Sequence, residues 1–298
     1  MHFLRWIQRQ HPPHSRSWQS LTSVALMHYS DLTELEGYLF PVFVSPGTEE
    51  RGKAIADRSQ RAYEFLGSTL EFEPELTVLV LAPEHWKAYA SFPLYGMPHY
   101  TEARTIALAG LDSRFWQSLL PAPGALPPAD EEAMRSVYGD SDGSLNLSPF
   151  FDLLAAHEMG HVFHLQAACH FPRLWLMELF CNLCLHAYVA AKEPGQLRAL
   201  ETFPRTVARA GAKTMDHRSL RDFEHLYTDV GSRNYGWYQC KLHVAAKVIF
   251  DAGGVDALRR LWKTFLRIRE SVTDDDLAAL LEGEVHPAVE HVLSTWPA

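Results

Sequence analysis

The chain contains few cysteines for its length. Only four occur among 298 residues, namely Cys169, Cys181, Cys184 and Cys240. Small secreted domains that depend on disulfide bonds have a much higher density of cysteine. Three of the four lie in apolar stretches with helical spacing, where a buried thiol packs as a small hydrophobic group. The sequence therefore excludes a disulfide-based scaffold, and the chain is long enough to bury a core without one.

An excess of positive charge is also absent. The chain has 27 lysines and arginines against 36 aspartates and glutamates, which gives a formal net charge of -9. Proteins that bind nucleic acids usually present a basic surface. We therefore expect neither DNA nor RNA as a partner.

Long hydrophobic segments are the third missing feature. The opening sequence MHFLRWIQRQHPPHSRSW has no apolar core followed by a small-residue cleavage site, so it does not resemble a secretory leader. No later apolar run approaches the length that a membrane-spanning helix needs. We therefore expect a soluble, cytoplasmic protein without a membrane partner, and the sequence leaves its oligomeric state open.

The first half of the chain has the pattern of a mixed α and β structure. Short apolar runs predict three strands, at residues 38–44, 76–82 and 105–110. A helix is predicted around residues 54–66. The proline-rich run PAPGALPP at residues 121–128 and the polar stretch after it predict a linker. We therefore predict an N-terminal α/β lobe with an edge strand over residues 1–145.

The second half is almost wholly helical in pattern. Ser148 suits an N-cap, and Pro149 suits the first helical position. Turns and glycines separate four predicted helices, at residues 148–168, 173–192, 238–252 and 256–269. We therefore predict a mainly helical lobe over residues 146–298, with a cleft between the two lobes.

The first of these helices carries the string His157-Glu158-Met159-Gly160-His161. A spacing of four residues puts both imidazoles on one helix face, close enough to bind a single metal ion. Glu158 projects about 100° further round the helix, where it can reach a water in an open coordination position and act as a general base. Because the chain has 16 histidines, chance produces such a string in about one sequence of this composition in twenty.

A candidate third ligand, Glu178, lies on the next predicted helix. A turn at Pro172 folds this helix back against the preceding one. Because an α-helix rises 1.5 Å per residue, His161 and Glu178 then lie at similar distances from the turn. A carboxylate on an apolar helix face is costly unless it binds a metal or pairs with a cation, and both interpretations stay open. Asn182, one turn further on, is a candidate to accept a hydrogen bond from a ligand imidazole.

The string HEMGH, followed after sixteen residues by Glu178 in the phrase W-L-M-E, resembles the gluzincin branch of the zincin metallopeptidases, in particular thermolysin-like or peptidase-MA-like proteins. The segments PLYGMPHYTEARTIALAG and NYGWYQCKLHVAAKVIFDAGG are similar to the cleft-lining edge strand and the tyrosine-bearing helix of such families. The resemblance implies an α+β zincin fold, a thermolysin-like catalytic domain, with one Zn²⁺ ion held by His157, His161 and Glu178.

Two departures from the family pattern affect the expected cleft. Leu179 follows the expected third ligand, Glu178, where many relatives have glycine. The larger side chain leaves less room for another backbone segment to approach the helix at this point. The acidic phrase with which large aminopeptidases recognise a substrate amine is also missing. Exopeptidase activity is therefore unsupported.

The resemblance also implies a mechanism. Zinc polarises the scissile carbonyl, and Glu158 takes a proton from the activated water and passes it to the leaving amine. A tyrosine stabilises the oxyanion, and the positional match favours Tyr238, with Tyr235 as the second choice. The alternative for each tyrosine is that it packs in the core.

Other metal arrangements fit the sequence poorly. The metzincin pattern needs a glycine three residues after the second histidine and a ligand three residues beyond, but His164 and Ala167 occupy these positions. A di-iron bundle needs a second E-x-x-H string, which the sequence lacks. Cys181 and Cys184 form a C-x-x-C string within an apolar helix but lack a partner pair, so we expect no structural zinc there.

The sequence therefore predicts a zinc metallopeptidase that hydrolyses peptide or protein substrates held in extended form along the strand near residues 105–110. One alternative is a catalytically inactive zincin-fold binding protein, which is favoured if Tyr235 and Tyr238 both point away from the metal. The other is a zinc hydrolase that acts on a non-peptide amide. Only substrate profiling separates the second alternative from the peptidase.

Overall fold

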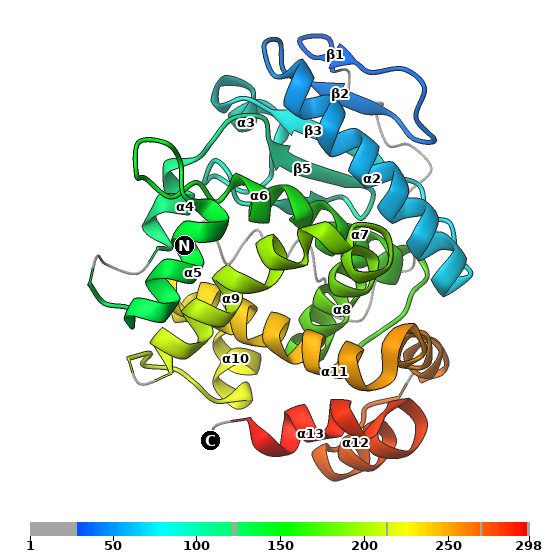
Figure 1. The fold of residues 1–298 in the computed structure, drawn as a ribbon. Helices are drawn as coiled ribbons and strands as arrows, with labels where there is room; N and C mark the ends of the chain where they lie inside the picture. The colour runs from blue at the N-terminus through cyan, green and yellow to red at the C-terminus, as the bar shows by residue number, and fades with distance from the viewer. Residues whose placement is uncertain (1–28, 121–123, 213, 269, 297–298) are drawn as a thin grey trace.

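The computed structural model describes residues 29–120, 124–212, 214–268 and 270–296. The opening segment examined for a leader and the start of the proline-rich run, residues 121–123, lie outside the described residues. Within them the chain is α+β, with helices predominating over one small sheet (Figure 1).

A five-stranded mixed sheet forms one layer of the molecule. Its strands are β1 (Thr33–Glu34), β2 (Val42–Val44), β3 (Thr77–Leu81), β4 (His99–Thr101) and β5 (Thr105–Ala109). They follow the order β1-β2-β3-β5-β4, in which β2, β3 and β5 are parallel and both outer strands are antiparallel to their neighbours. The apolar runs of β3 and β5 are buried almost throughout, as expected for central parallel strands.

The edge of the sheet next to the candidate site is β4, and the prediction of an edge strand at residues 105–110 was wrong. β5 pairs with β3 on one side and with β4 on the other, so neither of its sides is open. β4 pairs only with β5 and contributes His99 and Tyr100 to the lining of a cavity. β4 has only three residues, and two of them are polar. Such a short segment cannot be recognised as a strand from periodicity.

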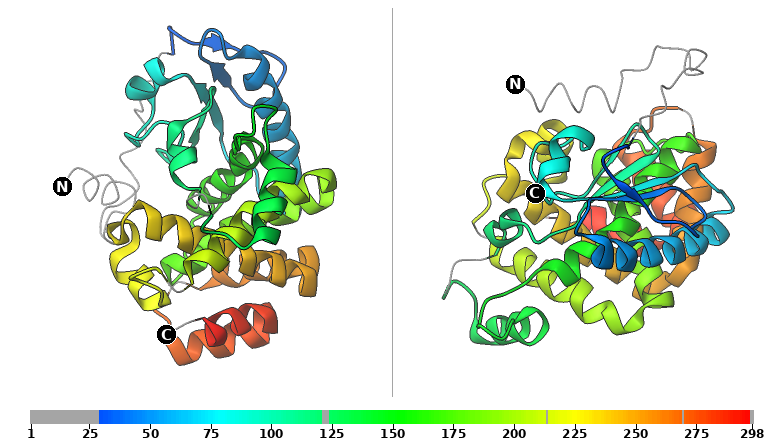
Figure 2. Two further views of the ribbon diagram at one scale, coloured as in Figure 1. Left: turned by 60° about the vertical axis from the view of Figure 1, so that its left-hand side comes forward. Right: turned by 90° about the horizontal axis from the view of Figure 1, so that it is seen from above.

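Helices make up most of the remaining structure (Figure 1). The described helices are α2 (Glu49–Leu70), α3 (Pro83–Tyr89), α4 (Arg114–Ser118), α5 (Pro128–Tyr138), α6 (Ser148–Phe151), α7 (Ala155–Gln166), α8 (Leu174–Lys192), α9 (Leu197–Gly211), α10 (Leu220–Leu226), α11 (Ser232–Arg267), α12 (Asp274–Leu280) and α13 (Pro287–Thr295). Figure 2 shows the sheet and α2 at one end of the molecule and α12 and α13 at the other. The sequence predicted that a helix ends at residue 252, before Gly253 and Gly254. In the structure the chain only kinks at this point, within α11, where Gly254 has a φ of 57°.

The segment predicted as a linker contains helix α5, which packs on α9. Tyr138 donates a hydrogen bond to the Ala199 carbonyl at 2.5 Å. Arg209 donates one to Asp130 at 3.1 Å. Proline at the first helical position and acidic residues in the first turn favour this helix. The surrounding prolines and glycines obscured that signal in the sequence.

Helix α8 is the apolar centre of the helical layer. By length and composition it could cross a membrane, with a mean hydropathy of 1.4, so the expectation that no apolar run approaches this length was wrong. However, 83% of its most apolar window is buried inside the described structure. Helices α7, α9 and α11 pack against it. The apolar run therefore serves as a core helix in this fold.

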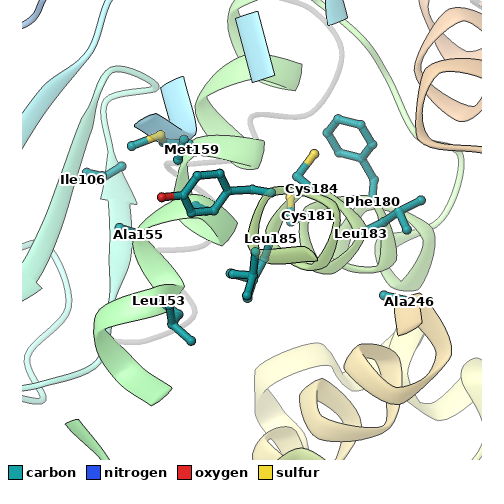
Figure 3. Close-up of a cluster of buried hydrophobic side chains, with 14 of the residues drawn as sticks. Ile106, Leu153, Ala155, Met159, Phe180, Cys181, Leu183, Cys184, Leu185 and Ala246 are labelled. Atoms are coloured by element: carbon teal, nitrogen blue, oxygen red, sulfur yellow. The ribbon is translucent and has the colours of Figure 1, made fainter. Parts of the chain in front are cut away.

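Helix α7 packs against both the sheet and α8. Figure 3 shows Met159 of α7 near Ile106 of β5, and Cys181 on the neighbouring α8. Gly160 permits this packing, because a Cβ added there would lie 3.0 Å from the Cα of Cys181 and 3.1 Å from its Sγ. The helix that carries the two motif histidines is thereby held close to the helix that carries Glu178.

Replacing this glycine should loosen the contact between the two helices. We expect Gly160→Ala to cost about 1–3 kcal/mol through overpacking, offset by about 1 kcal/mol of higher helix propensity, and to weaken metal binding. Gly67 in α2 is a matched control, because its added Cβ would meet its nearest atom at an ordinary 3.6 Å. Urea unfolding and zinc titration of both variants measure the difference. Unchanged zinc affinity in Gly160→Ala would show that close helix contact does not shape the site.

Candidate metal centre

Helix α7 turns both motif histidines toward α8. The rings of His157 and His161 lie 5.1 Å apart between centroids, and both side chains are buried. Nδ1 of His161 lies 3.3 Å from Nε2 of His164. Nδ1 of His157 has no hydrogen-bond partner among the described residues. The Nε2 atoms of both histidines face Glu178.

Glu178 brings one carboxylate oxygen between the two imidazoles. Its Oε2 lies 3.3 Å from His157 Nε2 and 3.6 Å from His161 Nε2. The residue is 0% exposed, and Oε2 accepts no hydrogen bond from any described residue. An unpartnered buried carboxylate oxygen is costly unless a cation neutralises it. The structure therefore brings together the three residues that the sequence predicted as ligands.

The electrostatics of this cluster favour a positive charge between the carboxylate and the imidazoles. Burial alone would raise the pKa of Glu178, but the charge of His161 and the closeness of both imidazoles to the carboxylate hold this pKa well below its usual value. Burial would likewise lower the pKa of His157, yet the nearby carboxylate of Glu178 and the charge of Glu158 raise it. A proton or a metal ion can supply the positive charge.

Tyr227 binds the second oxygen of the same carboxylate. Its hydroxyl donates a hydrogen bond to Glu178 Oε1 at 2.5 Å. The Tyr227 backbone has a φ of 45° and a ψ of -105°, a strained conformation for a residue other than glycine. Sequence reasoning missed Tyr227, because no local pattern marks a residue whose partner lies 49 positions away.

Cys181 is another residue that the sequence did not assign to the site. The ligand atoms of His157, His161 and Cys181 lie within 4.8 Å of one another, so this buried cluster could hold a metal ion. Cys181 lies three residues after Glu178, and residues at this spacing share a helix face. That spacing was the signal in the sequence that could have identified it.

Glu158 is buried beside the two histidines and lines the cavity to which β4 contributes His99 and Tyr100. Burial raises the pKa of its carboxyl, and the neighbouring charges of His157 and His161 partly oppose the increase. A carboxylate with a raised pKa is a better proton acceptor near neutral pH. The geometry is therefore compatible with the predicted role as a base.

A cavity of about 380 Å³ opens beside the cluster between the sheet edge and the helices. Most of its wall is apolar, formed by Phe92, Leu94, Met97, Phe115, Leu119, Phe150, Phe151, Leu154 and Phe203. Among the described residues that line it, the acidic side chains are Glu158 and Glu178, and there is no lysine or arginine. The cavity therefore suits an uncharged, bulky group next to the polar cluster.

The structure separates the two tyrosines proposed as oxyanion donors. Tyr235 lines the cavity, and burial followed by the negative charge of Glu178 raises the pKa of its phenol well above the usual value. Tyr238 lies outside the cavity lining, packs against Trp296 and donates its hydroxyl proton to the Ser219 carbonyl at 2.8 Å. This placement corrects the order expected from the sequence, because Tyr238 is a core residue and Tyr235 faces the site.

Asn182, proposed as a partner of a ligand imidazole, contributes to the raised pKa of His157, but its hydrogen bonds are made to other groups. Its Nδ2 donates to the Glu178 carbonyl at 2.9 Å and to Gln239 Oε1 at 3.2 Å. Its Oδ1 lies 3.3 Å from His243 Nδ1. Asn182 therefore connects α8 to α11 beside the candidate metal ligands.

The buried histidine of α8, His186, should make stability depend on pH. Burial lowers the pKa of His186 to about 4. The unfolded chain therefore takes up a proton between about pH 6.5 and pH 4 that the folded chain does not. The stability associated with the neutral imidazole is complete above pH 6.5 and decreases as the pH falls through this range.

Replacing His186 should remove this dependence. Between pH 7 and pH 5, we expect the parent to lose about 1–2 kcal/mol more stability than His186→Leu. Urea unfolding at both pH values measures the effect, with the exposed residue His291 changed to Gln as a control. Equal losses in the parent and in His186→Leu would rule out this origin of the pH dependence.

No protein-family model matches this chain, and no curated protein matches it significantly. The assignment of a function therefore depends on the residues and geometry of the site itself.

Proposed function

We propose that the chain is a zinc-dependent metallopeptidase of the gluzincin type with a zincin fold. The convergence of His157 Nε2, His161 Nε2 and the unpartnered Glu178 Oε2 on one buried point carries this proposal. Imidazole and carboxylate donors match the ligand preferences of zinc. A bound cation would also offset the buried negative charge of Glu178.

Glu178 is the proposed third ligand in preference to Cys181. Burial and the negative charge of Glu178 raise the pKa of the Cys181 thiol well above its usual value, so a metal would have to displace the thiol proton before Cys181 could bind it. Glu178 is held in its ionised form by its surroundings. The thiol also lies at the close contact with Gly160. These observations favour packing for Cys181 and coordination for Glu178.

The proposed chemistry divides the work among groups that line one cavity. When bound, the ion supplies Lewis acidity, which polarises a carbonyl and lowers the pKa of water. Glu158 accepts a proton from the attacking water at its carboxylate and later gives it to the leaving amine nitrogen. Tyr235 donates its phenolic proton to the substrate oxygen that becomes negative in the tetrahedral state.

The substrate is proposed to be a peptide with a bulky apolar side chain next to the cleaved bond. The phenylalanine- and leucine-rich wall supports this choice, since burial of one large apolar side chain contributes about 1.5–3 kcal/mol. The lack of lysine and arginine in the described lining supports cleavage within a chain, because no cation is available there to bind a terminal carboxylate. β4 offers an edge for an extended backbone.

Cleavage of internally quenched peptides by the zinc-loaded chain tests this proposal. We expect hydrolysis beside phenylalanine or leucine that a chelator abolishes and added zinc restores. Zinc binding without cleavage of any peptide in a mixed library would favour a binding protein or a hydrolase of non-peptide amides. Failure to bind zinc after reconstitution would contradict the proposal.

A further inference from the structure

The orientation of the Asn182 side chain is set by the protein backbone. Its Nδ2 lies 2.9 Å from the carbonyl oxygen of Glu178, one turn earlier on α8. A carbonyl oxygen can only accept, so the amide nitrogen must occupy this side. The amide oxygen then faces His243 Nδ1, at 3.3 Å.

This orientation is transmitted to Gln239 on α11. The Asn182 nitrogen also lies 3.2 Å from Gln239 Oε1. Because this nitrogen can only donate, the oxygen of Gln239 must face it, and the amide nitrogen of Gln239 must face away. That nitrogen lies 2.9 Å from the Tyr235 hydroxyl oxygen and donates to it. Gln239 and Tyr235 are four residues apart, on the same face of α11.

The direction of this last hydrogen bond decides where the phenolic proton of Tyr235 can go. A phenol has a single proton, and its oxygen here accepts from Gln239, so the proton is directed away from the amide. Asn182, Gln239 and Tyr235 all line the cavity beside the proposed metal ligands. Tyr227, the other tyrosine from this region that lines the cavity, donates its proton to Glu178 and also interacts with the Tyr235 hydroxyl. Its oxygen therefore holds the Tyr235 proton until a substrate oxygen in the cavity competes for it.

We propose that Gln239, held by Asn182, is a positioning residue that keeps the Tyr235 hydroxyl as a donor toward the substrate. This inference rests on the proposed peptidase function, in which Tyr235 stabilises the oxyanion. The hydrogen bonds that lead from the Glu178 carbonyl through the side chains of Asn182 and Gln239 to Tyr235 can be donated in one direction only. A side chain at position 239 that presents an oxygen to Tyr235 would draw the phenolic proton away from the substrate.

Gln239→Glu tests the proposal, because glutamate keeps the shape but replaces the donating nitrogen with an accepting oxygen. We expect kcat to fall about 10²-fold, as is typical when an oxyanion donor is lost, with little change in KM. Tyr235→Phe should show a similar loss, and the double variant should be no worse than either single variant. Gln239→Leu, which offers no acceptor, should lose less. Zinc analysis of each variant confirms that the metal site is intact.

A second measurement separates this proposal from the peptidase function itself. The affinity of the zinc-loaded protein for a peptide phosphonate, measured by calorimetry, reports donation to an anionic oxygen without turnover. We expect Gln239→Glu and Tyr235→Phe to weaken phosphonate binding to a similar extent. This result would support the positioning role even if the parent cleaves no peptide and the peptidase function fails.

Two results would overturn the positioning role while leaving the peptidase function intact. The first is a Gln239→Glu variant with the kcat and the phosphonate affinity of the parent. The second is a loss from Gln239→Glu that persists in full when Tyr235 is already phenylalanine, because the added charge would then act directly on the metal cluster.

Discussion

Glu158→Gln should abolish peptide hydrolysis while the protein still binds one zinc ion. The substitution keeps the size of the side chain but removes the carboxylate that accepts the proton from water. Loss of a general base typically costs about 10²–10⁴-fold in rate, the largest effect that we expect on turnover. Glu158 is not a proposed ligand, so zinc content should match that of the parent.

Two readouts make this experiment specific. Elemental analysis gives the zinc content of parent and variant, and peptide cleavage gives kcat and KM under chelator control. Glu131→Gln is a control outside the cavity lining, because the carboxylate of Glu131 accepts a hydrogen bond from the backbone nitrogen of Gly124 near the start of α5. A Glu158→Gln variant that retains the kcat of the parent would remove Glu158 from the mechanism.

Glu178→Gln should weaken zinc binding far more than Cys181→Ala does. Changing an outer-shell partner typically reduces metal affinity about 10–100-fold, and loss of a ligand should exceed that range. The neutral amide also cannot offset the charge of a bound cation in this buried position. Cys181→Ala removes a thiol that packs beside Gly160, so it should reduce stability modestly and leave zinc affinity close to that of the parent.

The pair of variants distinguishes the two possible ligand sets of the cluster. Zinc affinity is measured by competition with a chelator of known affinity, and urea unfolding controls for loss of structure. Cys184→Ala on the same helix is a matched control, because Cys184 is buried like Cys181 but lies outside the three-residue ligand cluster. A large loss in Cys181→Ala with little change in Glu178→Gln would make the thiol the third ligand.

The paired histidines and Glu178 could be predicted from the sequence because their placement depends on local rules. A spacing of four fixes His157 and His161 on one helix face, and a single turn between two helices fixes the depth of Glu178. The structure brings these residues together as the pattern predicted. Helix α8 extends over Leu174–Lys192, close to the predicted residues 173–192.

The tyrosines could not be ordered from the sequence because their roles depend on the rotation of α11. Tyr235 and Tyr238 are three residues apart, so their side chains lie only about 60° apart around the helix, and a small rotation of α11 decides which of them faces the cavity. The predicted helix began at Tyr238, whereas α11 begins at Ser232 and includes both residues. The crossing of α11 over α8, a tertiary contact, decides which tyrosine reaches the site.

Tyr227, Gln239 and β4 share a different reason for being missed. Tyr227 acts through a contact across 49 positions, and Gln239 through one across 57. β4 is recognised as a strand only by its pairing with β5. Such features depend on long-range packing, which periodicity and capping signals do not report.

The coordination of zinc bound to the purified chain can be measured directly by X-ray absorption spectroscopy. Ligation by His157, His161 and Glu178 predicts a shell of nitrogen and oxygen atoms only, with two imidazoles, at about 2.0–2.2 Å. A sulfur atom at about 2.3 Å would instead identify Cys181 as a ligand. That result, or a chain that binds no zinc at all, would contradict the proposed metal centre.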